Sequence, residues 1–346
     1  MKALNLLVYG VIKFFLVIGR IVPAEITFFW MKVLVRIVYP FLRKRRKIML
    51  WNLEHALGDE TTPEERERIA FRSMENLFLA MGELLHLEKI MSQFDRRFTW
   101  EGKEIVDRYI AEGRGFFVFG GHYGGWTLPS IAPAMFPELS AVNMVARPLR
   151  NPYLDGILHY LAGKFKGKVV TTRGTGREIT DAIDNGELVG LYMDQESRRS
   201  QGIFVKFFGK DALSHVVPGY LAWKHDIPLI PFWIPRTKPG HFHVIFREPL
   251  QYELTDDPEE NNRRVTQAIA AEVERTIRER PEQWLWAHSR WRRRPDGTVH
   301  PLFERKRRSR KKWQKSGDYL SSADQARKSR SQQEEGRKEN GAPPDS

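Results

Sequence analysis

The 346-residue sequence contains no cysteine. Disulfide bonds, thiolate nucleophiles and cysteine-based zinc sites are therefore excluded, and the composition suits a reducing compartment. The H-E-x-x-H pattern and histidine pairs at helical spacing are also missing, so we expect no metal site. Walker and Rossmann glycine patterns are absent as well, and we expect no bound cofactor.

Acidic residues are outnumbered by basic ones. The chain has 56 Lys and Arg against 43 Asp and Glu, which gives a formal net charge of +13. Such a protein favours anionic partners, namely nucleic acid, anionic lipid headgroups or an acidic carrier protein. From about residue 304 the chain is basic and almost without apolar residues, so we predict a disordered tail at 304–346. Nucleic acid binding by this tail is not the function that we expect.

The N-terminal segment, residues 1–47, is rich in Leu, Val, Ile and Phe but lacks a long uncharged run. Its longest uncharged stretch, ALNLLVYGVI at 3–12, is shorter than the roughly 20 residues that a membrane-spanning helix needs. On a helical projection the charged residues form narrow stripes, which is typical of a helix in the membrane interface. RKRRK at 43–47 would then meet an anionic membrane surface. A single tilted span and a pair of buried core helices are the alternatives.

The body of the chain, residues 48–303, alternates short apolar strands with helical patterns. Residues 52–90 read as helix, turn and helix, with a capping box from Thr62 to Glu65. The expected strands are 116–120, 140–146, 168–172, 188–194, 202–208 and 228–234, with 242–246 closing an edge. The expected helices are 102–112, 126–135, 152–165, 176–185, 213–225 and 261–279. This alternation predicts an α/β domain with a mixed, mostly parallel sheet flanked by helices.

Three polar side chains follow the ends of expected strands, namely His122, Arg147 and Asp194. Ligands of such sheets bind at the carboxyl ends of the strands, so we expect the three residues to share one rim. His122 stands in GGHYGGW, where the glycines let a substrate approach closely. Because no Ser or Cys nucleophile is near, His122 is predicted to be a general base that takes a proton from a hydroxyl, which then attacks an acyl donor.

These stretches resemble the bacterial lipid A late acyltransferases (lauroyl and myristoyl transferases) of the lysophospholipid acyltransferase superfamily. The resemblance covers about residues 1–295. It is carried by GGHYGGWT at 120–127, VARPLRNPYLD at 145–155, LYMDQE at 191–196, GIFVKFFG at 202–209, ERPEQWLWAHSRWRRRP at 279–295 and NL at 52–53.

The resemblance implies a glycerol-phosphate-acyltransferase-like α/β fold with an N-terminal apolar segment that anchors it to the membrane. It implies transfer of a fatty acyl chain from acyl carrier protein, or from a coenzyme A thioester, to a hydroxyl of a membrane lipid acceptor. That acceptor would be a lipid A precursor or a similar glycolipid. The expected location is the cytoplasmic face of the bacterial inner membrane, with His122 as the base.

Position 127 departs from the family motif, which is His, four residues, then Asp or Glu. Thr127 stands there instead. One explanation is that another carboxylate orients the imidazole, and our order of preference is Asp194, Glu196 and Glu138. A second is that Thr127 suffices at a lower rate. A third is that the protein is a catalytically degenerate lipid-binding membrane protein of the same fold.

Substrate contacts are expected from Arg147, whose planar guanidinium suits a phosphate group. A surface ion pair is the alternative role for this side chain. Thr127, Gln195 and Glu196 complete the expected substrate-binding set. WAHSRWRRRP at 286–295 could contact lipid phosphates, an acidic carrier protein or nucleic acid, and the apolar N-terminus favours lipid. His288, within this stretch, is expected to be structural.

Overall fold

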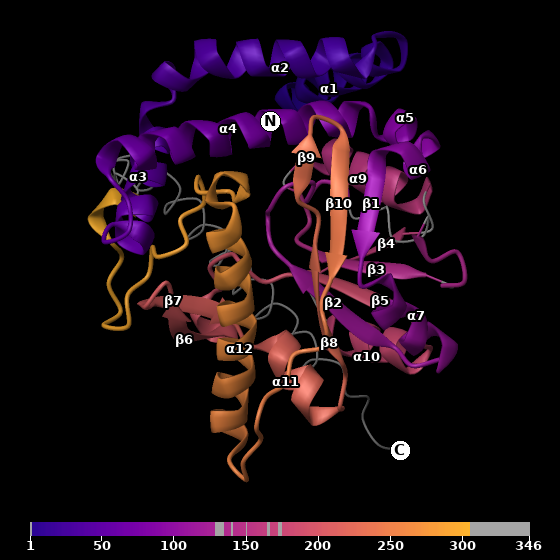
Figure 1. The fold of residues 1–346 in the computed structure, drawn as a ribbon, viewed down its shortest axis with the longest axis vertical. Helices are drawn as coiled ribbons and strands as arrows, with labels where there is room; N and C mark the ends of the chain where they lie inside the picture. The colour runs from indigo at the N-terminus through magenta and orange to yellow at the C-terminus, as the bar shows by residue number, and fades with distance from the viewer. Residues whose placement is uncertain are drawn as a thin grey trace, which may run out of the picture. The chain divides into compact units, whose positions relative to one another are not determined.

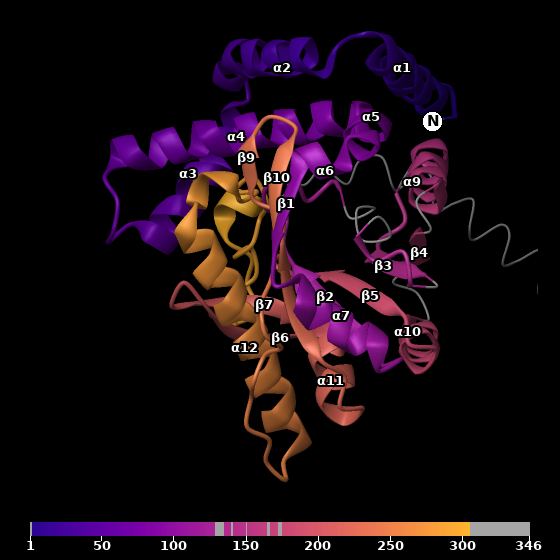
Figure 2. The same cartoon turned by 45° about the vertical axis from the view of Figure 1, so that its right-hand side comes forward.

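The computed structural model describes residues 2–128, 135–139, 141–149, 151–164, 167–171 and 175–304, and Figures 1 and 2 show it from two directions. The helices are α1 (Lys2–Ile21), α2 (Ala24–Val38), η1 (Tyr39–Phe41), α3 (Arg43–Leu57), α4 (Pro63–Leu85), α5 (Leu87–Ser92), α6 (Phe94–Arg97), α7 (Lys103–Ala111), α9 (Pro152–Lys164), α10 (Thr175–Asp184), η3 (Arg199–Gln201), α11 (Val217–Lys224), α12 (Pro258–Glu279), η4 (Pro281–Gln283) and η5 (Pro301–Phe303). The strands are β1 (Phe98–Glu101), β2 (Phe116–Gly120), β3 (Val142–Ala146), β4 (Gly167–Thr171), β5 (Leu188–Tyr192), β6 (Gly202–Phe207), β7 (Lys210–His215), β8 (Leu229–Trp233), β9 (Arg236–Lys238) and β10 (His241–Phe246). The predicted tail lies outside the described residues, except for Glu304.

The main sheet has the strand order β1-β10-β8-β2-β5-β3-β4, and β9 pairs with β10. Strands β8, β2, β5, β3 and β4 run parallel, whereas β10 is antiparallel to β8. All five residues of β2, FFVFG, are buried, as expected for a parallel strand that is covered on both faces. The mixed, mostly parallel sheet flanked by helices is therefore confirmed.

Three details of the predicted elements were wrong. FHVIF does not close an edge, because β10 lies between β1 and β8. The strand GIFVKFF does not join the main sheet, since β6 pairs with β7 in a separate two-stranded sheet. The helix expected at 213–225 begins only at Val217, because residues up to His215 belong to β7.

The hairpin between β6 and β7 explains the last two differences. Phe207 pairs with Lys210, so the loop consists of Phe208 and Gly209, and both have positive φ, 53° and 67°. This backbone matches a two-residue type I′ turn, which joins antiparallel strands with the correct twist. Most of the helix expected at 126–135 lies outside the described residues.

Helix α4 crosses the upper end of β9, β10 and β1, with α2 on its far side (Figure 1). It begins with the predicted capping box, since the side chains of Thr62 and Glu65 each accept a hydrogen bond from the other's backbone N–H. Its inward face bonds to segments from three distant parts of the chain, through Ser73, Ala80 and Glu83. Helix α4 therefore joins the outer helices to the sheet.

The N-terminal helices pack on α4 by one face only. Ala24, Phe28 and Val35 of α2 are buried, and Thr27 Oγ1 lies 2.8 Å from His86 Nε2. The opposite faces of α1 and α2, together with η1, expose large apolar side chains, namely Leu6, Val8, Phe14, Val17, Ile21, Ile26, Phe29, Trp30, Leu34, Ile37 and Phe41. The alternative of a pair of fully buried core helices is therefore wrong.

No helix in the described part of the chain is both long enough and apolar enough to cross a membrane. The expected apolar anchoring segment at 1–47 consequently has no support from a spanning helix. The RKRRK stretch forms the start of α3, which continues past residue 47 into the body of the protein.

Candidate active site

The site lies where two neighbouring parallel strands, β2 and β5, end. Gly120 pairs with Tyr192 in this ladder, so His122 and Asp194 each stand two residues beyond the same pair. The two loops approach so closely that a Cβ atom at Gly121 would lie 3.0 Å from Asp194 Cγ. Parallel register and a glycine thus bring together two residues that are 72 positions apart in the sequence.

The Asp194 carboxylate contacts the ring of His122 directly. His122 Nδ1 lies 2.9 Å from Asp194 Oδ1, and the His122 backbone N–H donates to Oδ2 at 2.9 Å. Trp284 Nε1 donates to the same Oδ2 at 2.8 Å. Since a carboxylate can only accept, Nδ1 of the neutral ring carries the proton and Nε2 keeps its lone pair.

Asp194 and His122 differ in solvent exposure, and this difference assigns them different roles. The Asp194 side chain is 2% exposed and the His122 side chain 16% exposed, so a substrate can reach only the imidazole. Burial alone raises the pKa of Asp194. The charge that His122 carries when protonated, its ring and backbone hydrogen bonds, and the hydrogen bond from the Trp284 indole outweigh burial and hold the pKa well below its usual range. Asp194 is therefore an anion that can stabilise the imidazolium form of His122.

The imidazole ring is enclosed by two aromatic rings and an amide. Its centroid lies 4.7 Å from that of Trp126 and 4.9 Å from that of Tyr192. Gln195 Nε2 is 3.0 Å from the ring Nε2 and 3.2 Å from Nδ1. An atom so close to both nitrogens cannot lie in the ring plane without colliding with Cε1, so the amide covers a ring face. The in-plane lone pair of Nε2 is left for a substrate hydroxyl.

Of the three carboxylates proposed as partners of His122, Asp194 is the one that contacts the ring in the described structure. Glu196 is buried and forms ion pairs with Arg292, at 2.7 Å, and with Arg293. Glu138 is exposed in a turn. Neither of them therefore orients the imidazole in the described structure. The Glu196 carboxylate is paired with two arginines, and its substrate contact stays a prediction.

The structure also locates two further predicted site residues, Thr127 and Arg147. The Thr127 hydroxyl donates to the Ala80 carbonyl of α4 at 3.3 Å, so it bonds to a helix and not to the imidazole. Arg147 follows β3 as expected, is exposed, and forms no hydrogen bond or ion pair with any residue that the structure describes. Burial, with a smaller contribution from the charge of Arg147, lowers the pKa of His215 to about 4. The substrate contacts of Thr127 and Arg147 stay predictions.

The loop that carries His122 is held by side chains and backbone groups to which the sequence analysis gave no such role. Arg236 Nη2 donates to the Gly124 carbonyl at 3.1 Å and is itself paired with Glu83 at 2.6 Å. The Gly124 N–H donates to the Gln283 carbonyl. Gly124 has φ of 56°, and a Cβ there would lie 2.2 Å from the Ile234 carbonyl oxygen, so a side chain is excluded.

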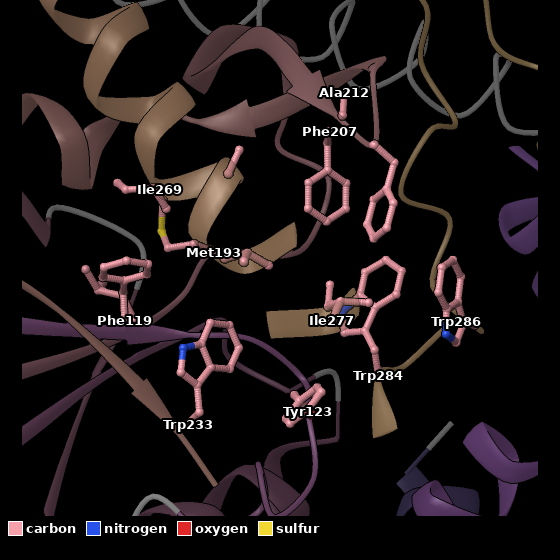
Figure 3. Close-up of a cluster of buried hydrophobic side chains, with 14 of the residues drawn as sticks. Phe119, Tyr123, Met193, Phe207, Ala212, Trp233, Ile269, Ile277, Trp284 and Trp286 are labelled. Atoms are coloured by element: carbon pink, nitrogen blue, oxygen red, sulfur yellow. The ribbon is translucent and has the colours of Figure 1, made fainter. Parts of the chain in front are cut away.

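The base of the site is aromatic. Tyr123 forms a bridge with Trp284, and both belong to a buried cluster with Trp233 and Trp286 that Figure 3 shows. Trp284 lies in ERPEQWLWAHSRWRRRP, a stretch singled out from the sequence, although nothing in that stretch indicated a contact with Asp194. The rigid packing fixes the position of the carboxylate.

Comparison with known proteins identifies the family of this chain. The profile of the family described as bacterial lipid A biosynthesis acyltransferase matches residues 2–293. The chain belongs to this family. The resemblance inferred from the sequence is thereby confirmed, and the protein is an acyltransferase.

Its curated relatives are similar but not close. The chain is 24% identical over 264 residues to a lipid A biosynthesis acyltransferase of Haemophilus influenzae, covering 74% of this chain and 78% of the relative. It is 27% identical to the lipid A biosynthesis lauroyltransferase of Escherichia coli, covering 74% and 82%. It is 26% identical to the lipid A biosynthesis palmitoleoyltransferase of the same species, covering 75% and 82%.

Acid is expected to destabilise this acyltransferase through His288. Its Nε2 accepts a hydrogen bond from the Glu196 N–H at 3.2 Å, and burial lowers its pKa from 6.5 to about 4. The unfolded chain therefore binds a proton first, so stability is complete above pH 6.5 and falls as the pH drops toward 4, by at most about 3 kcal/mol for this residue. Urea unfolding of the wild type and of His288→Gln at pH 7.5 and pH 5 measures this loss of stability. Equal pH dependence of the two proteins would contradict the assignment.

Proposed function

We propose that this acyltransferase moves a fatty acyl chain from acyl carrier protein to a hydroxyl of a lipid A precursor or a similar glycolipid, with His122 as the general base. One observation carries the proposal, namely the 2.9 Å contact between His122 Nδ1 and Asp194 Oδ1 beneath an accessible ring. The names of the relatives, lauroyltransferase and palmitoleoyltransferase of lipid A biosynthesis, support the choice of reaction.

His122 Nε2 can carry out both proton transfers of the reaction. His122 Nε2 takes the proton of the acceptor hydroxyl as its oxygen attacks the thioester carbonyl carbon. The imidazolium that forms is stabilised by Asp194 through Nδ1. The tetrahedral intermediate then collapses by breaking its carbon–sulfur bond, and the departing thiolate takes the proton from Nε2. The products are an ester and a free thiol.

The same proposal places the protein on an anionic membrane surface at the cytoplasmic face of the bacterial inner membrane. Support comes from the apolar outward faces of α1 and α2, where Phe29 and Trp30 are 60% and 59% exposed. Exposed apolar patches of this kind mark interaction sites, and Trp suits the membrane interface. Arg147, on the rim that carries His122, would contact an anionic group of a substrate.

This geometry removes the reason for the alternative hypothesis of a catalytically degenerate lipid-binding protein. That alternative depended on the missing carboxylate at Thr127. Asp194 supplies a buried charge at the ring itself, so the carboxylate at 127 is not needed to orient the imidazole.

A transfer assay with the purified full-length protein tests the proposal. Radiolabelled acyl carrier protein and a tetra-acylated lipid A precursor are expected to give a product that carries one additional acyl chain. A parallel reaction with the coenzyme A thioester identifies the preferred donor. If the protein transfers no acyl chain from either donor to this precursor, the proposed function is wrong.

A further inference from the structure

A large apolar pocket lies apart from the His122 ring, between α1, the end of α4 with α5, and α9. Its volume is about 930 Å³, within the usual range for ligand pockets. Tyr9, Leu16 and Val17 form one wall, Leu85 a second, and Tyr153 and Ile157 a third. In Figure 2, α1, α5 and α9 lie near one another at the upper right.

Two links connect the pocket to the segments that carry the site. Thr127, five residues after His122, bonds to Ala80 of α4, and Leu85 lies five residues further along that helix, about 7.5 Å at the helical rise. On the other side, α9 begins at Pro152, soon after Arg147 on the rim. A lipid tail that spans one leaflet of a bilayer core is about 15 Å long, which is longer than this rise along α4.

The chemistry of the pocket fits an amphiphile that carries negative charge. Its walls are mostly apolar, and the charged residues that line it are Lys13, Lys89 and Glu88, so the positive charges outnumber the negative one. Val17 both lines the pocket and belongs to the exposed apolar face of α1, so the pocket is continuous with the surface proposed to meet the bilayer. A lipid already in the membrane can enter by this route, whereas the donor chain arrives on a soluble carrier.

We propose that this pocket binds a fatty acyl chain already present on the acceptor lipid, with Lys13 and Lys89 near its phosphate. The assignment rests on the proposed function, because it takes the acceptor to be an acylated, phosphorylated glycolipid. Binding of the tail there holds the acceptor hydroxyl near His122. The pocket is thus a determinant of acceptor affinity, separate from the groups that perform the reaction.

Gly156→Phe tests the pocket without disturbing the fold. Gly156 of α9 lines the pocket, and a Cβ there would meet nothing within 4 Å. The phenyl ring is expected to occupy the space of the lipid tail and raise the KM for the tetra-acylated precursor by about 10-fold or more. The KM for the acyl carrier protein substrate, and kcat at saturating acceptor, should stay at the wild-type values.

Gly163→Phe is the matched control. It lies on the same helix, a Cβ there also meets nothing within 4 Å, and it is not among the residues lining the pocket. We expect wild-type values for all constants. An effect equal to that of Gly156→Phe would overturn the proposal. A raised KM for the donor instead of the acceptor would also overturn it, because the donor chain would then occupy the pocket.

Binding without turnover separates this inference from the proposed function. The probe is the radiolabelled tetra-acylated precursor, mixed with the full-length protein in nonionic detergent without a donor. Gly156→Phe should weaken its binding by about 10-fold, matching the KM effect, and Gly163→Phe should not. Weaker binding in a protein that transfers no acyl chain would leave the pocket standing while the function fails. Unchanged binding in an active enzyme would refute the pocket alone.

Discussion

Changing His122 to alanine is expected to lower kcat for acyl transfer by about 10⁴-fold, the upper end of the range for loss of a general base. No side chain that the structure describes can replace its Nε2, because Gln195 lies over the ring face and Asp194 is buried at 2% exposure. Measurement of radiolabelled product under single-turnover conditions gives the value directly. A rate within 10-fold of wild type would rule out the imidazole as the base.

Asp194→Asn is expected to cost almost as much, about 10³- to 10⁴-fold, by a different physical route. An amide N–H facing Nδ1 favours the tautomer with the proton on Nε2, which has no lone pair to accept the substrate proton. Thr127→Val is the control, because the Thr127 hydroxyl bonds to Ala80 and not to the ring. It should lower kcat only a few-fold. The reverse order of effects, with Thr127→Val the more severe, would contradict the assigned partner.

Arg236→Met is expected to destabilise the fold by about 3 to 5 kcal/mol, because it leaves the charge of Glu83 buried without a counter-charge. The two side chains are 3% and 0% exposed, and both Glu83 oxygens accept from Arg236 at 2.6 Å. Urea unfolding at neutral pH measures the loss. The double variant Arg236→Met/Glu83→Leu should be more stable than Arg236→Met, since it removes the orphaned charge as well.

An exposed pair of the same kind provides the comparison. Arg263 also holds a carboxylate with two hydrogen bonds, to Glu260 on α12, at the protein surface. Arg263→Met should change the unfolding midpoint little, since solvent screens such pairs. If Arg236→Met were equally harmless, the buried pair would contribute nothing to the fold. If the losses of stability from Arg236→Met and from Glu83→Leu simply added in the double variant, the two side chains would not be coupled.

The strands of the parallel sheet could be predicted because each is a short, mostly apolar run bounded by turn residues. The same signal failed for ALSH at 212–215, where an apolar pattern suits a strand and a helix equally well over so few residues. The turn that makes this segment a hairpin needs positive φ at Phe208 as well as at Gly209, and the sequence gives no sign of that conformation at a phenylalanine.

Asp194 could be named from the sequence because it follows a strand that the pattern could locate, and in the structure it contacts His122. Glu83 and Arg236 could not be found in this way. They lie 153 residues apart, and Glu83 stands inside a helix, where an acidic residue ordinarily faces solvent. Pairing between remote buried charges depends on tertiary packing, which leaves no local periodicity in the sequence. The Trp284 contact with Asp194 was missed for the same reason.

The absence of a side chain at Gly121 has a consequence for how this enzyme can change over time. Even a methyl group there would press on the Asp194 side chain, at 3.0 to 3.2 Å, and push the carboxylate away from its ring nitrogen. The residue at position 121 and the residue at position 194 therefore constrain each other through direct contact. Random mutagenesis of both codons, followed by selection for activity, should return glycine and aspartate as a pair and seldom either one alone.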